Sequence, residues 1–300
     1  IMQIISWIIG TLLQWYIWMP IVAVLMFLTW RNYRKIEDFT PVESVLLVLE
    51  IPRTNDKQEL AAEQLFASLH GILRDNKELR LSGGHQEHIS FEIASVNGQI
   101  RFYVWVPKTL QSFVEGQIYS QYPTVQIHQA DEDYTEHERD HEVAYSTELT
   151  LTTDEFLPIR TFQNFEVDPL AGITGTLAKL ETTGEELWIQ VLVRPIPDDW
   201  QNAADRYINS IKNGRMFSLP GFGGSMQWLI GVLGALWQPP EQGVGQSTKI
   251  ELSDRDKTRI SEAEKKATKL GYEVKIRLVY MGESQTNAKL RMQALVGTFK

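Results

Sequence analysis

The first thirty residues of the chain constrain its fold more than any other feature, because they contain no charged side chain. The stretch from Ile1 to Trp30 is dense in Ile, Leu, Val, Phe and Trp, residues that favour insertion into a bilayer. About 20 apolar residues are enough for one membrane-spanning helix. A secretory signal peptide would have a basic start and a shorter apolar stretch, and the run has neither. The sequence therefore predicts a single transmembrane helix within an anchor at residues 1–35, with the lipid bilayer as a partner.

Three basic side chains, Arg31, Arg34 and Lys35, follow the apolar run at once. Basic residues flank the cytoplasmic end of membrane helices. This cluster predicts a single-pass protein of the cell (inner or cytoplasmic) membrane, with its soluble part in the cytoplasm. The chain has no cysteine, which agrees with a reducing compartment and excludes disulfides and thiolate metal sites.

Small and polar residues lie on one stripe of the predicted anchor helix: Gln3, Ser6, Gly10 and Gln14. Residues three or four positions apart share a helix face. Ser6 and Gly10 also form a small-xxx-small pair, which lets two helices approach closely in a membrane. The stripe predicts a helix contact in a homo-oligomer. The alternative, that polar residues fall there by chance near an interface, remains open.

The chain is acidic, with 38 Asp and Glu against 29 Lys and Arg and a formal net charge of −9. The part that follows the basic cluster is more acidic than this total suggests. Binding to nucleic acid through its phosphates needs clustered Lys and Arg, whereas beyond Lys35 the basic residues are mixed with acidic ones. No direct binding to nucleic acid is expected.

Residues 44–130 contain the clearest local signal, two alternating runs that start at Ile89 and Ile100 and are joined by Asn97-Gly98. Asn-Gly is the preferred two-residue hairpin turn, because both positions tolerate positive φ. An apolar strand and an amphipathic helix precede this hairpin, and a helix and a strand follow it. The order strand, helix, strand, strand, helix, strand is typical of a ferredoxin-like (βαββαβ) unit. The predicted fold class is therefore α+β, with a ferredoxin-like domain at 44–130.

An acidic linker at 131–143 leads to a second α/β domain at 144–300, where the order strand, proline, amphipathic helix recurs. Asp168-Pro169 and Ser253 predict the starts of two of its helices. We expect a unit related to the first, interrupted by an apolar insertion at 216–240.

The insertion contains a short apolar helix that is predicted to need a cover. At 1.5 Å per residue, Met226 to Trp237 measures about 18 Å, which is too short to span a bilayer. Soluble domains rarely expose large apolar patches, so the segment is predicted to dock on the bilayer or on a neighbouring subunit. The alternative, that it covers the chain's own core, remains open. The predicted docking residues are Phe217, Phe222, Trp228, Leu229, Ile230, Leu233, Leu236 and Trp237.

One motif suggests chemistry. His137-Glu138-Arg139-Asp140-His141 matches H-E-x-x-H, in which two histidines one helical turn apart bind zinc and the glutamate acts as general base. The match lies in a run of charged residues rather than in a buried helix, so a solvated linker is the favoured interpretation. A membrane-tethered, metal-dependent hydrolase is the alternative function. Neither glycine-rich stretch, at 221–225 or 243–249, has the lysine before the hydroxyl that a P-loop needs.

Several stretches together resemble a known family: residues 49–72, 89–127 and 165–200, and the terminal LVGTFK. They are similar to the N-terminal region of membrane-anchored, type IV secretion-like conjugative transfer ATPases. The resemblance implies a non-catalytic adaptor that precedes a HerA/FtsK-like motor domain, and these 300 residues contain no Walker motif of such a motor. The apolar insertion at 216–240 departs from the family pattern.

The residues and the resemblance together predict a membrane-anchored, self-associating assembly or adaptor domain of a secretion or DNA-transfer apparatus. Its expected partners are further copies of itself, a motor ATPase domain or secretion-channel subunits. We expect no enzymatic activity, no cofactor and no bound metal.

Overall fold

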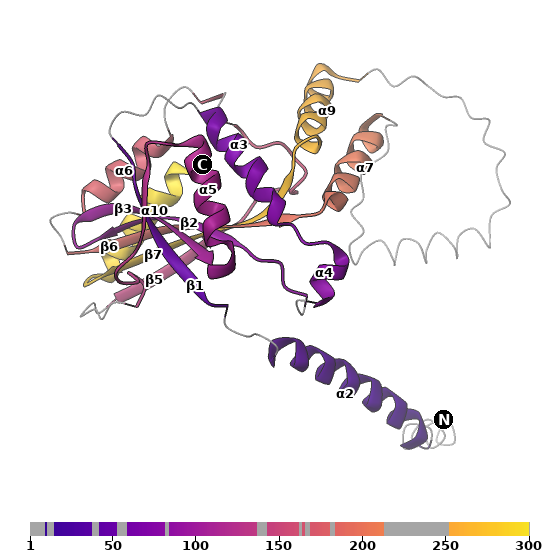
Figure 1. The fold of residues 1–300 in the computed structure, drawn as a ribbon. Helices are drawn as coiled ribbons and strands as arrows, with labels where there is room; N and C mark the ends of the chain where they lie inside the picture. Colours follow the sequence, from indigo (N-terminus) through magenta and orange to yellow (C-terminus); the bar gives the residue numbers. More distant parts are fainter. Residues whose placement is uncertain are drawn as a thin grey trace. The chain divides into compact units, whose positions relative to one another are not determined.

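The computed structural model describes Gly10 and residues 15–37, 42–52, 59–81, 84–136, 143–161, 164–165, 169–180, 184–212 and 252–299. The chain divides into two compact units, both drawn in Figure 1. Residues 1–43 and 76–85 form the first unit, and residues 44–75 and 86–300 form the second.

The first unit contains α2 (Trp15–Glu37) and α4 (Asn76–Leu81). Within the described residues, α2 is uncharged from Trp15 to Trp30. No helix in the described ranges combines the length and the apolar character that crossing a membrane requires. The transmembrane helix that the sequence predicted is therefore not found among the described residues, and this part of the predicted fold class is wrong.

The second unit is built on one seven-stranded sheet in the order β4-β1-β3-β2-β6-β7-β5, in which every neighbouring pair is antiparallel. The strands are β1 (Ser44–Glu50), β2 (Ile89–Val96), β3 (Gln99–Pro107), β4 (Gln126–Gln129), β5 (Val143–Leu149), β6 (Glu186–Ile196) and β7 (Gly271–Gly282). The predicted hairpin joins β2 to β3. Asn97 and Gly98 have φ of 51° and 73°, the left-handed values that this turn requires, so the hairpin prediction is confirmed.

The prediction of a ferredoxin-like unit followed by a second, related unit is wrong. Such units would each have a sheet of their own, whereas here the outer edge of β2 pairs with β6, from Ile89 opposite Val193 to Ser95 opposite Leu187. The sheet therefore continues from the first half of the chain into the second, and all seven strands belong to it. The local order of elements misled the prediction, because it does not specify which strand edges meet.

Helices cover one face of this sheet, as Figure 1 shows. Over β1, β2 and β3 lie α3 (Glu59–Leu69) and α5 (Gln111–Gln121), which bury Leu65, Leu69, Val114 and Ile118. Over β6 and β7 lie α6 (Pro169–Ala178) and α10 (Gln285–Thr298). The strand residues in both clusters, such as Val104, Ile89, Ile189 and Leu278, share this face through the register of the sheet. Burial of these side chains is the main stabilising term of the unit.

The remaining helices form a pair. After a short 3₁₀ turn (Asp198–Trp200), α7 (Gln201–Lys212) packs against α9 (Asp254–Ala267) through Ile208, Ile260 and Ala263. The predicted cap is confirmed, since the Ser253 hydroxyl accepts a hydrogen bond from the Asp256 N–H at 3.2 Å. This pair has a small core of its own.

Candidate functional site

The sheet face opposite the helices carries a row of side chains that passes through all seven strands. The register places one residue of each strand in the row: His128, Val48, Tyr103, Glu92, Gln190, Arg277 and Glu148, from β4 to β5. Most of these side chains are polar, and Tyr103, Glu92 and Gln190 lie on three inner strands of the sheet. The row is the first candidate site, because polar groups in the middle of a sheet must find partners.

A buried carboxyl group occupies the centre of this row. The Glu92 side chain is 7% exposed and accepts a hydrogen bond from the Tyr134 hydroxyl. The amide of Gln190 donates to the same hydroxyl oxygen at 3.0 Å. Burial raises the pKa of Glu92, because it disfavours the carboxylate, and the hydrogen bond from Tyr134 offsets part of this rise. The carboxyl and the phenol satisfy one another.

Tyr134 reaches Glu92 from the segment that follows β4. The first step of this segment extends the strand, since the Ala130 N–H donates to the Leu46 carbonyl at 2.8 Å. The Tyr134 ring then packs on Tyr103, with ring centroids 4.8 Å apart, and meets the edge of Trp188 at 4.9 Å. Burial and the Glu92 carboxylate raise the pKa of Tyr134 far above its usual range. The sequence prediction treated this segment as part of a solvated linker and missed the contact of Tyr134 with Glu92. The available signal was Tyr134 itself, an aromatic residue within the acidic stretch Asp131–Glu136.

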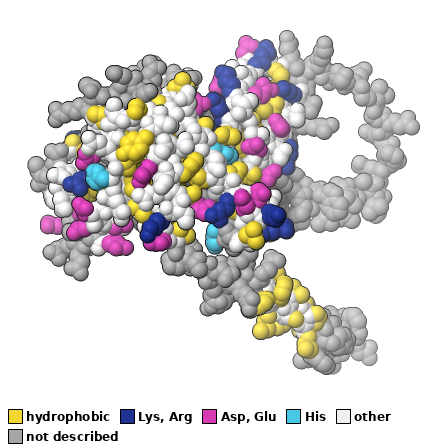
Figure 2. All heavy atoms as spheres, in the orientation of Figure 1, with side chains coloured by type: hydrophobic (Ala, Val, Ile, Leu, Met, Phe, Trp, Pro, Cys, Tyr) yellow, Lys and Arg dark blue, Asp and Glu magenta, His cyan; other side chains and the backbone are white. Residues whose placement is uncertain are grey.

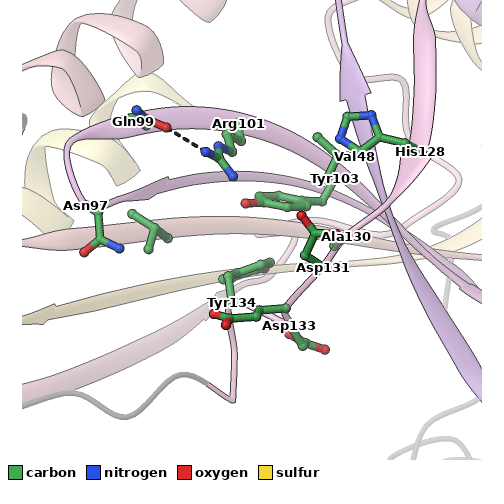
Figure 3. A pocket seen from close by; sticks show the side chains of 12 residues that line it. Val48, Asn97, Gln99, Arg101, Tyr103, His128, Ala130, Asp131, Asp133 and Tyr134 are labelled. Atoms are coloured by element: carbon green, nitrogen blue, oxygen red, sulfur yellow. Dashed lines mark hydrogen bonds between the residues drawn. The ribbon is translucent and has the colours of Figure 1, made fainter.

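A hollow of about 380 Å³ lies beside Tyr134. Figure 3 shows it between the β2–β3 hairpin, with Gln99 and Arg101, and the segment that carries Asp131 and Asp133. The Arg101 guanidinium donates to Gln99 Oε1 at 2.7 Å, and Asp133 accepts from the N–H and the hydroxyl of Thr135. Its lining residues are Val48, Val96, Asn97, Gln99, Arg101, Tyr103, His128, Ala130, Asp131, Glu132, Asp133 and Tyr134. The hollow offers charges of both signs and hydrogen-bonding groups for polar contact with a partner.

The second candidate site is the apolar surface of α2. Ten large apolar side chains between residues 18 and 30 are 42–68% exposed: Trp18, Met19, Ile21, Val22, Val24, Leu25, Met26, Phe27, Leu28 and Trp30. Figure 2 shows them as a continuous apolar surface on the face in view. Successive helical residues point about 100° apart, so side chains at so many consecutive positions cover every side of the helix. An apolar surface of this kind marks a contact with a protein or a membrane.

The structure places few of the residues that the sequence predicted as contact sites. Arg31, Arg34 and Lys35 lie in the last turns of α2, next to its apolar surface. Gly10 is helical and exposed, and a Cβ added to it would meet no heavy atom within 4 Å. The other three residues of the predicted stripe, Gln3, Ser6 and Gln14, lie outside the described residues.

The docking and zinc predictions also lie outside the described residues. This holds for all eight docking residues between Phe217 and Trp237, and for both histidines of the H-E-x-x-H match, His137 and His141. Within the part of the chain that the structure describes, no group of three or more His, Asp or Glu side chains is placed to hold a metal ion.

Neither curated proteins nor solved structures give a significant match to this chain. Residues 37–300 match the model of a domain of unknown function, DUF8128. The matched region begins in the last turn of α2 and includes the whole seven-stranded sheet. The chain therefore belongs to the DUF8128 family.

Proposed function

We propose that the protein is a membrane-attached, non-catalytic assembly domain of a type IV secretion-like or conjugative DNA-transfer apparatus. The observation that carries the proposal is α2, whose apolar side chains are exposed on every side. Soluble domains rarely leave apolar patches of this kind uncovered. A helix that lies in a membrane interface buries apolar side chains among the lipid headgroups and acyl chains.

The charges beside this surface favour lipid over protein. Arg31, Arg34 and Lys35 follow directly after Trp30 on the same helix. Basic residues next to a membrane-bound segment are attracted to anionic headgroups, by about 1 kcal/mol for each side chain near the surface. The acidic remainder of the chain is repelled by the same headgroups, so the charge pattern orients the chain with α2 toward the bilayer.

The assembly part of the proposal rests on the open sheet face and on the family resemblance. The polar hollow beside Tyr134 has side chains for contact with protein partners, and we assign these to a motor ATPase or to channel subunits of the apparatus. We further propose that the domain lies at the cytoplasmic side of the cell membrane.

A cell assay tests this function. In donor cells that lack the gene, the full chain is supplied either unchanged or with Leu25→Glu, Met26→Glu and Phe27→Glu. These three side chains are 56–68% exposed, so their replacement leaves the core intact. We expect the variant to leave the membrane fraction and the frequency of DNA transfer to fall at least tenfold at equal protein level.

Two apolar residues elsewhere provide the matched control. Leu151 and Ile159 are 60% and 64% exposed in the second unit, and Leu151→Glu with Ile159→Glu should leave both membrane retention and transfer unchanged. Normal retention of the α2 variant would contradict the attachment. Loss of retention with normal transfer would contradict the role in the apparatus.

A further inference from the structure

The strand β5 forms one edge of the sheet. All seven of its residues pair with β7, from Val143 opposite Gly282 to Leu149 opposite Ile276. In the described part of the chain no strand lies on its other side. Four of the seven residues, Ala144, Tyr145, Ser146 and Glu148, are exposed. An edge of this kind presents unpaired backbone N–H and C=O groups that can pair with another strand.

The opposite edge of the sheet differs in length and in its contacts. There, β4 has only four residues, and the Ile127 N–H donates to the Tyr119 hydroxyl at 3.2 Å. Very short edge strands are one way in which proteins prevent pairing between sheets. The longer β5 also lacks Lys, Arg and Pro, residues that commonly protect an edge. Its one charged side chain, Glu148, forms ion pairs with Lys275 and Arg277 on β7.

The order of the strands indicates in which direction a further strand beside β5 would run. From the centre of the sheet outward, the first half of the chain reads β2-β3-β1 and the second half reads β6-β7-β5. Thus β5 occupies the place that β1 has in the other half. The outer side of β1 is covered by β4, which is antiparallel to it. The position beyond β5 is therefore suited to an antiparallel strand.

The sequence of β5 matches itself in the antiparallel direction. If two copies meet about Ser146, Val143 lies opposite Leu149, Ala144 opposite Glu148 and Tyr145 opposite Thr147. All seven residues are then paired, and no glutamate faces another glutamate. Side chains of opposed residues point to the same face of a sheet, so Val143 and Leu149, which pack on the core beneath α10, extend that apolar layer into the second copy.

We propose that the protein forms a two-fold dimer by antiparallel pairing of β5 with β5 of a second copy, centred on Ser146. The two seven-stranded sheets then form one continuous sheet, with α3, α5, α6 and α10 of both copies on the same face. This dimer uses neither α2 nor the hollow beside Tyr134, so it is independent of the proposed membrane attachment.

The absence of cysteine from the chain allows a sharp test. In the proposed register the two Ser146 Cα atoms lie about 4.5–5.5 Å apart, which is within the range for a disulfide. The two Ala144 residues are on the same face but offset by about 14 Å along the strand, which is beyond it. The full-length Ser146→Cys and Ala144→Cys variants are oxidised with copper phenanthroline and run on non-reducing gels. We expect a covalent dimer from S146C and monomer from A144C, and equal yields from both would overturn the register.

Light scattering on the full chain provides a second measurement. Ser146→Lys places two ammonium groups opposite each other, and it should shift the dimer to a monomer with an unchanged circular dichroism spectrum. Ser120→Lys, on the exposed surface of α5, should remain dimeric. Both substitutions are introduced into the chain that also carries the three glutamates in α2, so association through that helix does not contribute. If the chain that carries the three glutamates in α2 and an unchanged Ser146 is already a monomer, the proposal is overturned.

Discussion

Tyr134 donates its hydroxyl hydrogen to Glu92, a residue that lies 42 positions earlier in the chain and in the middle of the sheet. This one bond closes the segment after β4 over the open sheet face. It also gives a buried carboxyl group of that face a donor. The segment after β4, the strand β2 and the hollow beside Tyr134 are therefore all linked through the pair of Tyr134 and Glu92.

Removing the hydroxyl should destabilise the second unit. In Tyr134→Phe the buried Glu92 loses the hydrogen bond from this hydroxyl, and a hydrogen bond to a charged group contributes about 1.5–3 kcal/mol. The free energy of unfolding from urea titration should fall by that amount. Tyr145→Phe is the matched control, because Tyr145 is 47% exposed, and its effect should be close to zero. Equal effects of the two substitutions would show that the bond contributes nothing.

The raised pKa of Glu92 predicts a pH dependence of stability. A carboxyl group whose pKa is higher in the folded than in the unfolded protein binds more protons in the folded state. Its contribution to stability is therefore complete below the ordinary glutamate pKa of 4.5 and is lost as the pH rises through the folded value. Glu92→Gln removes this titration. The unfolding free energy of the unchanged protein minus that of E92Q should decrease from pH 4.5 to pH 8, and a constant difference would contradict the assignment.

Two glycines should respond to alanine with opposite signs. A Cβ on Gly271, at the start of β7, would lie 3.0 Å from a side-chain carbon of Ile196 and would overlap the Trp200 indole. Overpacking of this kind costs about 1–3 kcal/mol. A Cβ on Gly116, inside α5, meets nothing within 4 Å, and alanine there should stabilise the helix by about 0.5–1 kcal/mol. Thermal unfolding of Gly271→Ala and Gly116→Ala measures both, and shifts in the same direction would contradict the packing described.

The sequence predicted well those features that neighbouring residues determine. The Asn97-Gly98 turn adopts positive φ because of its own two residues, and Ser253 caps the helix that follows it. It failed where distant strands meet. The pairing of β2 with β6 joins Phe91 to Val191, a hundred residues later, and no local pattern specifies that contact.

The candidate site was missed for the same reason. Glu92 is one polar residue in an alternating strand, and only the register shows that it is buried and lies next to Gln190. The transmembrane anchor was predicted from hydropathy, whereas no helix among the described residues has the length and apolar character that crossing a membrane requires.

Flotation with lipid vesicles tests the proposed membrane attachment through α2. The purified full chain is mixed with vesicles of phosphatidylcholine and phosphatidylglycerol and centrifuged through a density gradient. We expect the unchanged chain and the Leu151→Glu, Ile159→Glu control to rise with the vesicles. The Leu25→Glu, Met26→Glu, Phe27→Glu variant should stay at the bottom. Replacing Arg31, Arg34 and Lys35 by glutamine should weaken binding only when phosphatidylglycerol is present. Flotation of the α2 variant to the same extent as the unchanged chain would contradict membrane attachment through α2.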